Sequence, residues 1–217
     1  MFTLPDFNKP FDYENSFYLS CDSKRIAKVL AQYELYKMTQ EVPGDIMEFG
    51  IFKGCSFVRL CAFRDAFENL SKKIIGFDVF GAFPDNGLAT DFDKQLRHKY
   101  ADGFSQHSIS RDQLIAVLRN KRIENTELIQ GDIQETLPEF TRQNPEIKVS
   151  LIHMDVDIHG PSKVIIETLY QRLSKGGVLI FDNYDALKGE AKAVDEYFGK
   201  EKIQYLPFCK SPCYIVK

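Results

Sequence analysis

Apolar residues along the chain recur at two spacings, one typical of β-strands and the other of α-helices. Short apolar runs followed by a glycine or an aspartate predict five strands, at 45–49, 73–77, 126–130, 149–154 and 178–181. Apolar residues three or four positions apart predict five helices, at 23–40, from Ser56 onward, and at 135–143, 162–173 and 190–198. Two last apolar runs, 203–208 and 213–216, predict a β-hairpin that turns around Ser211 and Pro212.

Stop signals support two of these predicted helices. Pro43 and Gly44 follow the first helix and end it. Gly176 and Gly177 follow the helix that starts at residue 162 in the same way. The apolar stripe of the first helix consists of Ile26, Val29, Tyr33 and Tyr36. We expect this stripe to face the core.

Strands that alternate with helices predict an α/β fold, in which right-handed crossovers build a parallel sheet covered on both faces. A chain of 217 residues fits one such domain, which we place at 1–217, with a helical cap at 1–42. The alternation is interrupted at 80–110, where Asp91–Tyr100 predicts a helix of its own. Insertions of this length often cover a substrate site, so we expect a lid here, with a plain surface loop as the alternative.

Composition excludes several classes of function. The apolar content of 44% and the charged content of 27% are those of an ordinary globular protein. A net charge of −3 provides no basic surface, so we expect no nucleic-acid partner. No apolar run approaches the roughly 20 residues of a membrane span, and the first residues lack the pattern of a signal peptide.

The five cysteines suit reduced thiols in a cytoplasmic protein, because their number is odd and their spacings are scattered. Only Cys209 and Cys213 lie close together in the sequence. Without a second pair of cysteines or histidines they cannot form a four-ligand zinc site. We interpret them as two thiols that flank the turn of the C-terminal hairpin.

Acidic residues follow four of the five predicted strands. The residues directly after the strands are Gly50, Asp78, Gly131-Asp132, Asp155 and Asp182. In parallel sheets, ligands bind beyond the carboxyl ends of the strands, where these side chains meet. Each acid taken singly is also a common helix cap or turn residue, but their joint placement favours a binding site.

The turn after the first strand, Glu48–Ser56, favours a nucleoside ligand without phosphates. Its glycines, Gly50 and Gly54, allow a tight turn and a close approach of the backbone to a ligand. The spacing lacks both the G-x-G-x-x-G of dinucleotide sites and the lysine of a Walker loop. Asp78 is placed to accept hydrogen bonds from ribose hydroxyls, and Asp132 lies where an acid often meets adenine.

Four blocks of the sequence resemble the macrocin O-methyltransferase family of sugar-modifying enzymes. Gly44–Ser56 resembles that family's first motif, and Phe77–Pro84 is similar to its F-D-S-F-E-G-L-P segment. Gly131–Pro138 resembles its third block, and the acids after the last two strands resemble its L-D-x-D and D-D-Y blocks. The blocks occur in register over roughly residues 43–200.

This resemblance implies a Rossmann-like class I methyltransferase fold, with a mostly parallel seven-stranded sheet, helices on both faces and a C-terminal β-hairpin. It also implies S-adenosylmethionine as the methyl donor. The cofactor contacts that it implies are Glu48, Gly50, Phe52, Gly54, Ser56, Asp78, Asp132 and Ile133.

A second acidic cluster predicts a magnesium site. Asp155 and Asp182 end neighbouring strands about 4.8 Å apart, and Asn183 follows directly. Two carboxylates and an amide oxygen suit Mg²⁺, which also keeps positions for water and substrate oxygens. Asp155 is further expected to act as the catalytic base. The alternative is that Asp182 and Asn183 only start a loop and cap the next helix.

Two departures from the family pattern concern this cluster and the substrate. Asn183 stands where the family has an aspartate, and the Asp-Asn pair instead resembles catechol-type O-methyltransferases. His159-Gly160-Pro161 replaces the family's Tyr-Glu-Ser, so the identity of the substrate does not carry over. Whether His159 or Asp157 assists as a base is left open.

The acceptor implied by the resemblance is a hydroxyl of a sugar or a glycosylated small molecule. A phenolic or polyketide hydroxyl is one alternative, and a nucleoside-binding domain without catalysis is another. No membrane partner is expected, and the assembly state is left open between a monomer and a homo-oligomer.

Overall fold

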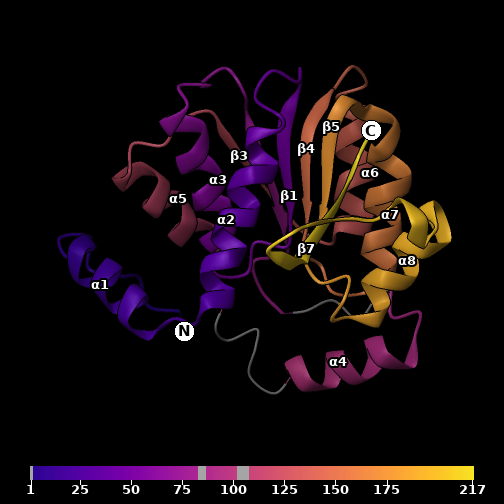
Figure 1. Ribbon diagram of the computed structural model, residues 1–217, viewed down its shortest axis with the longest axis horizontal. Helices are drawn as coiled ribbons and strands as arrows, with labels where there is room; N and C mark the ends of the chain where they lie inside the picture. Colours follow the sequence, from indigo (N-terminus) through magenta and orange to yellow (C-terminus); the bar gives the residue numbers. More distant parts are fainter. Residues whose placement is uncertain (1, 83–86, 102–107) are drawn as a thin grey trace.

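The computed structural model describes residues 2–82, 87–101 and 108–217, and in this part of the chain seven strands form one sheet (Figure 1). The strands are β1 (Asp45–Phe49), β2 (Ile74–Asp78), β3 (Thr126–Gln130), β4 (Val149–Met154), β5 (Leu173–Phe181), β6 (Gln204–Leu206) and β7 (Cys209–Val216). Their order is β3-β2-β1-β4-β5-β7-β6. The first five strands are parallel, whereas β7 runs antiparallel to β5 and β6. The predicted α/β fold with a mostly parallel sheet and a C-terminal hairpin is confirmed.

Helices cover both faces of this sheet. They are α1 (Pro10–Ser20), α2 (Ser23–Lys37), α3 (Cys55–Ala66), α4 (Asp91–Ala101), α5 (Arg111–Asn120), α6 (Ile133–Gln143), α7 (His159–Leu169) and α8 (Lys188–Phe198). One apolar core packs α6, α7 and α8 against one face, and a second core packs α2, α3 and α5 against the other (Figure 1). Among the described helices, none has both the length and the apolar composition of a bilayer-spanning segment.

The sheet topology determines where a ligand can bind. β1 pairs with β2 on one side and with β4 on the other, so the connections after β1 and after β4 leave toward opposite faces of the sheet. Such a switch point opens a crevice at the carboxyl ends of the strands. The central strand β4 is buried along its whole length, as expected for a parallel strand covered on both faces.

The glycine pair Gly176-Gly177 lies inside β5, so its interpretation as a helix stop was wrong. α7 already ends at Leu169, and a 3₁₀ turn leads into β5. The pair accommodates an irregularity of the strand: Gly176 has a left-handed backbone with φ of 80°, and a Cβ on Gly177 would lie 2.9 Å from the carbonyl oxygen of Ser150. A sequence pattern cannot distinguish this close packing of strands from the end of a helix.

The turn of the C-terminal hairpin was also predicted at the wrong place. The chain turns between β6 and β7, at residues 207–208, and Ser211-Pro212 lies within β7. Cys209 and Cys213 are therefore two buried free thiols of one strand and do not flank the turn. Pairing of β7 with β6 explains the difference, because β5 pairs with β7 only as far as Cys213 and the pairing with β6 extends β7 past the proline to Cys209.

The buried face of α2 differs from the predicted stripe. Its buried residues are Ala31, Gln32, Leu35 and Tyr36, and only Tyr36 belongs to the expected set. Ile26, Val29 and Tyr33 are half-buried. Position 28 precedes Gln32 by one turn, so Lys28 lies on the side of the helix that faces the sheet.

The insertion at 80–110 contains α4, as predicted, and α5, which was not predicted, begins directly after it. Residues 83–86 and 102–107 lie outside the described residues, so the expected lid is described only in part. Asp93 of α4 is buried, and a Cβ on Gly189 of α8 would lie 2.1 Å from its Oδ1. The described part of the insertion thus packs against the start of α8, and its role as a lid stays a prediction.

Candidate active site

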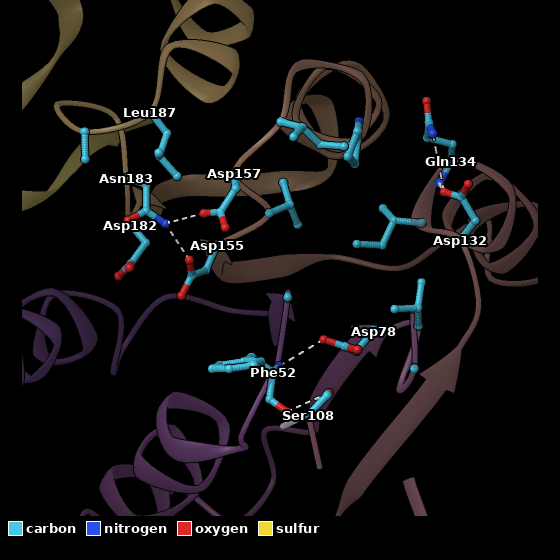
Figure 2. Close-up of a pocket in the computed structure, with 18 of the residues that line it drawn as sticks. Phe52, Asp78, Ser108, Asp132, Gln134, Asp155, Asp157, Asp182, Asn183 and Leu187 are labelled. Atoms are coloured by element: carbon cyan, nitrogen blue, oxygen red, sulfur yellow. Dashed lines mark hydrogen bonds between the residues drawn. The ribbon is translucent and has the colours of Figure 1, made fainter. Parts of the chain in front are cut away.

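A cavity of about 430 Å³ opens at the carboxyl ends of the parallel strands (Figure 2). The sequence-predicted residues that line it are Gly50, Phe52, Asp78, Asp132, Ile133, Asp155, Asp182 and Asn183. Glu48, Gly54 and Ser56 are not part of its wall. In Figure 2 the acids after β4 and β5 lie at one end of the cavity, and Asp132 with Gln134 at the other. The cavity therefore has two chemically distinct ends.

The Asp78 carboxylate organises the turn after β1 and the segment after β2. Its Oδ2 accepts hydrogen bonds from the amides of Ile51 at 2.6 Å and Phe52 at 3.0 Å, and its Oδ1 accepts one from Phe80 at 2.6 Å. Phe52 and Phe80 both have a φ of 51°, a conformation that costs energy for a residue with a side chain. A carboxylate has about four acceptor positions, so capacity remains for a ligand in the cavity.

Gly50 brings the end of β1 against the end of β4. Its φ is 86°, and a Cβ at this position would lie only 1.8 Å from the backbone oxygen of Asp155. Gly54 also has a left-handed backbone, with φ of 81°, but it starts α3 and packs near Leu114. Gly50 thus joins the predicted cofactor turn to the acidic end of the cavity, and Gly54 shapes the helix behind it.

Glu48 and Ser56 lie behind the turn in a buried polar network. Ser56 Oγ donates a hydrogen bond to Glu48 Oε1, and His153 Nδ1 lies 3.4 Å from that same oxygen. His153 Nε2 lies 3.2 Å from Asp182 Oδ1. Burial alone would lower the pKa of His153, but its hydrogen bond to Asp182 and its close contact with Glu48 raise this pKa to about 10. A protonated imidazole therefore holds both buried carboxylates in place.

Asp132 starts α6 at the other end of the cavity. Its Oδ1 accepts a hydrogen bond from the backbone amide of Gln134 at 2.9 Å, which is the geometry of a helix cap. Asp132 is therefore a helix cap, which was the alternative interpretation of this acid. Asp132, Ile133 and Gln134 nevertheless all line the cavity. An adenine contact at this end stays a prediction.

The acids after β4 and β5 converge around the Asn183 side chain. Asn183 Nδ2 donates to Asp155 Oδ1 at 2.6 Å and to Asp157 Oδ1 at 2.7 Å (Figure 2). Asp157 was not among the predicted ligands, although it belongs to the D-x-D block. Its φ of 68° is strained for a residue with a side chain, as is common at functional sites. Two carboxylate oxygens thus point at one position.

Lys28 is the main residue that the sequence did not reveal. Its Nζ lies 2.5 Å from Asp182 Oδ2. Burial would lower the pKa of Lys28, but the charges of Asp182 and Asp155 outweigh it and raise this pKa. Burial would likewise raise the pKa of Asp182, but His153 and Lys28 hold it below its usual value. The sequence pattern that could have revealed Lys28 is a lysine in line with the residues of α2 that face the sheet.

The donor set of this cluster fits a divalent cation. One oxygen from each of Asp155 and Asp182 and a ring nitrogen of His153 lie within 4.8 Å of one another, and because His153 is protonated, the ligands here are the carboxylate oxygens. Burial, together with the charges of Asp182 and Asp157, raises the pKa of Asp155 well above its usual value, so the negative charge there is not fully compensated. The Asn183 amide group lies between Asp155 and Asp157, and the opposite orientation of this amide would present its oxygen as a further ligand for a cation.

Replacing Glu190 with glutamine is expected to stabilise the metal-free protein at neutral pH. Glu190 is buried, its Oε1 accepts a hydrogen bond from the amide of Asn183, and its Oε2 has no partner among the described residues. Burial raises the pKa of Glu190 well above its usual value. The folded state therefore retains a proton that the unfolded state releases above about pH 4.3, so stability falls as pH rises past that value. Glutamine does not ionise and avoids this loss.

Thermal unfolding in EDTA measures this effect. The melting temperature of Glu190→Gln should exceed that of the wild type near neutral pH, by roughly 2–4 °C for each kcal/mol gained. The difference should shrink toward zero as the pH falls to about 4, where both states bind the proton. Glu135→Gln, an exposed change on α6, serves as the control. A gain that does not depend on pH would contradict the explanation.

Comparisons with known proteins agree on one family. Residues 17–207 match the macrocin O-methyltransferase (TylF) family. The chain is 26% identical over 162 residues to the 8-demethyl-8-(2,3-dimethoxy-alpha-L-rhamnosyl)-tetracenomycin-C 4'-O-methyltransferase of Streptomyces olivaceus, covering 73% of this chain and 59% of that protein. It is 26% identical over 164 residues to the demethyldecarbamoylnovobiocin O-methyltransferase of Streptomyces niveus, covering 73% and 60%. The chain thus spans about 60% of the length of these relatives.

Solved structures give the same assignment of the fold. The crystal structure of CalS11, a calicheamicin methyltransferase, is similar with a TM-score of 0.71 and 26% sequence identity. The match covers 96% of this chain and 87% of that one. Together with the strand order, this confirms the predicted class I methyltransferase fold.

Proposed function

The chain belongs to the macrocin O-methyltransferase family, and we propose that it transfers a methyl group from S-adenosylmethionine to a hydroxyl of a sugar or glycosylated small molecule. The proposal rests on one observation: the glycine turn after β1 and the acidic cluster after β4 and β5 line the same cavity. Gly50 touches the backbone of Asp155, so a methyl donor in the turn and an acceptor at the acids would meet at this contact. The free cysteines suit the cytoplasmic location that we propose with this activity.

The donor side of the cavity supports a nucleoside with a positively charged sulfonium. Asp78 holds the turn after β1 and retains acceptor capacity for ribose hydroxyls. Asp132 and Ile133 line the far end, where we place the adenine. Gly50 lies against the backbone of Asp155, and the amide of Phe52 donates to Asp78, so we place the sulfonium beside these two residues. Glu48, Gly54 and Ser56 support the turn from behind and make no contact with the cavity.

The acceptor side supports proton removal from a hydroxyl. Methyl transfer breaks the sulfur–carbon bond and forms an oxygen–carbon bond, and the hydroxyl proton must leave. Asp155 is the proposed base, because burial raises its pKa and so strengthens it as a proton acceptor. Asp155, Asp182 and Asn183, joined by Asp157, are the residues that would hold Mg²⁺. When bound, this ion supplies Lewis acidity that lowers the pKa of the acceptor hydroxyl.

The test uses rhamnosides as acceptors, because the name of the Streptomyces olivaceus relative contains a rhamnosyl group. S-adenosylhomocysteine should raise the melting temperature, since a ligand that binds only the folded state stabilises it. Mass spectrometry should detect a methylated rhamnoside in the presence of S-adenosylmethionine and Mg²⁺. EDTA should stop the reaction and added Mg²⁺ should restore it.

Different failures of this test have different meanings. Methylation of a phenol and not of a rhamnoside would show that the acceptor is a phenolic hydroxyl and not a sugar hydroxyl. Binding of S-adenosylhomocysteine without turnover of either acceptor class would favour a domain without catalysis. Full activity after exhaustive chelation would contradict the metal and leave Asp155 as a simple base.

A further inference from the structure

Lys28 carries a positive charge from the N-terminal helix α2 into the acidic end of the cavity. Its ammonium lies 2.5 Å from Asp182 Oδ2, and 27% of its side chain stays exposed while that of Asp182 is buried. α2 covers the face of the sheet opposite to α7 and α8. Lys28 therefore reaches the cluster from an element that contributes nothing else to the described wall of the cavity.

Lys28 retains hydrogen-bonding capacity toward the cavity. An ammonium has three N–H donors, and within the described residues Asp182 is the one hydrogen-bond partner of this group. The side chain lines the cavity beside Asp155 and Asn183. The remaining donors are therefore available to a ligand that occupies this end.

The charges of the cavity wall also point to Lys28. Lys28 is the one cationic side chain among the described residues that line the cavity, whereas Asp155, Asp157 and Asp182 contribute three carboxylates to the cluster. His153 does not line the cavity, and it shares its charge with Glu48 on the other side. The positive charge of Lys28 compensates one of the three carboxylate charges. The two negative charges that remain equal the charge of one divalent ion.

We propose that Lys28 provides a permanent positive charge in the acceptor site. Its ammonium neutralises one charge of the acidic cluster, and its remaining donors bind an acceptor oxygen next to the hydroxyl that is methylated. The ligand chemistry is that of a vicinal diol, as in a sugar ring. The contact with the acceptor rests on the proposed function, whereas the effect on the charge of the cluster concerns the protein alone.

The charge role is tested with Mn²⁺ and the free protein, without cofactor or acceptor. Lys28→Met removes one positive charge beside the cluster, so Mn²⁺ should bind roughly tenfold more tightly or better than to the wild type, by Coulomb's law at an intermediate effective dielectric constant. Lys28→Arg keeps the charge and should stay near the wild type. Lys24→Met, an exposed change one turn earlier on α2, is the matched control. Unchanged or weaker Mn²⁺ binding by folded Lys28→Met would overturn the proposal.

The acceptor contact is tested with a rhamnoside and an analogue that lacks the hydroxyl next to the methylated one. Lys28→Met should raise KM for the rhamnoside roughly tenfold or more, because a hydrogen bond from a charged donor is lost. The variant should not raise KM for the analogue, and its affinity for S-adenosylhomocysteine should equal that of the wild type. Equal KM increases for both acceptors would overturn the contact. If the wild type methylates no rhamnoside, the proposed acceptor fails, and the Mn²⁺ titration alone decides on Lys28.

Discussion

Replacing Asp155 with asparagine is expected to reduce methyl transfer by about 10²–10⁴-fold, the usual contribution of a positioned general base. The substitution is nearly isosteric, and the amide oxygen of the new residue can still accept the hydrogen bond from Asn183 Nδ2. The fold should therefore persist. What is lost is the negative charge that would accept the hydroxyl proton and help to hold the cation. In the metal-free protein, removal of this partly uncompensated charge should leave stability unchanged or raise it.

The affinity of the protein for S-adenosylhomocysteine separates this effect from damage to the cofactor site. Because this ligand carries no sulfonium charge, calorimetry should find its affinity within a few-fold of the wild-type value. Asp112→Asn on α5, an exposed residue outside the cavity wall, should leave both activity and binding unchanged. Wild-type turnover by Asp155→Asn would exclude Asp155 as the base, and Asp157, which contacts the same Asn183 amide, would be the next candidate.

The parallel strands could be predicted from the sequence because their cause is local. β1, β3 and β4 were predicted with the bounds that the structure shows, since each is an apolar run that stops at a turn residue. The C-terminal hairpin and the start of β5 were misplaced. The start of β5 depends on its pairing with β4 and the turn of the hairpin on the pairing of β7 with β6, and the local apolar pattern contains no record of either pairing.

In the candidate site, too, some residues could be predicted from the sequence and others could not. The acids after the strands were predicted to converge because the topology of a parallel sheet brings them to one edge, and Asp78, Asp155 and Asp182 do line one cavity. Glu48 was expected at the cofactor and is fully buried behind the turn, where His153 and Ser56 contact it. Lys28 was missed because its partner, Asp182, is 154 residues away. Motifs show which residues follow strands, but long-range contacts determine what each side chain touches.

The second large effect is expected for Gly50→Ala, which should impair both folding stability and cofactor binding. At a φ of 86° a residue with a Cβ pays roughly 1–2 kcal/mol. The new Cβ would also lie 1.8 Å from the backbone oxygen and 2.7 Å from the carbonyl carbon of Asp155. Both atoms belong to the backbone at the end of β4, which is buried on both faces and cannot rotate away as a side chain could. The ends of β1 and β4 would have to separate.

Such a separation would disturb both ends of the cavity at once. The amide of Gly50 donates to the carbonyl oxygen of Phe77, and the amide of Asp155 donates to that of Phe49, so these two bonds fix the turn and the base to the same strand ends. Gly50→Ala should therefore lower the melting temperature by several degrees, at roughly 2–4 °C for each kcal/mol lost. Its affinity for S-adenosylhomocysteine should fall more than tenfold.

Gly81→Ala provides the matched control for this prediction, because Gly81 lines the same cavity without a left-handed backbone. Among the described residues, a Cβ on Gly81 would meet the carbonyl oxygen of Val79 at 3.7 Å, which is ordinary contact. Calorimetry and thermal unfolding of the two variants, side by side, isolate the clash from the mere addition of a methyl group to the cavity wall. If Gly50→Ala melts and binds S-adenosylhomocysteine as Gly81→Ala does, β1 and β4 do not meet at Asp155. The cofactor turn and the acidic cluster would then not share the contact on which the proposed methyl transfer depends.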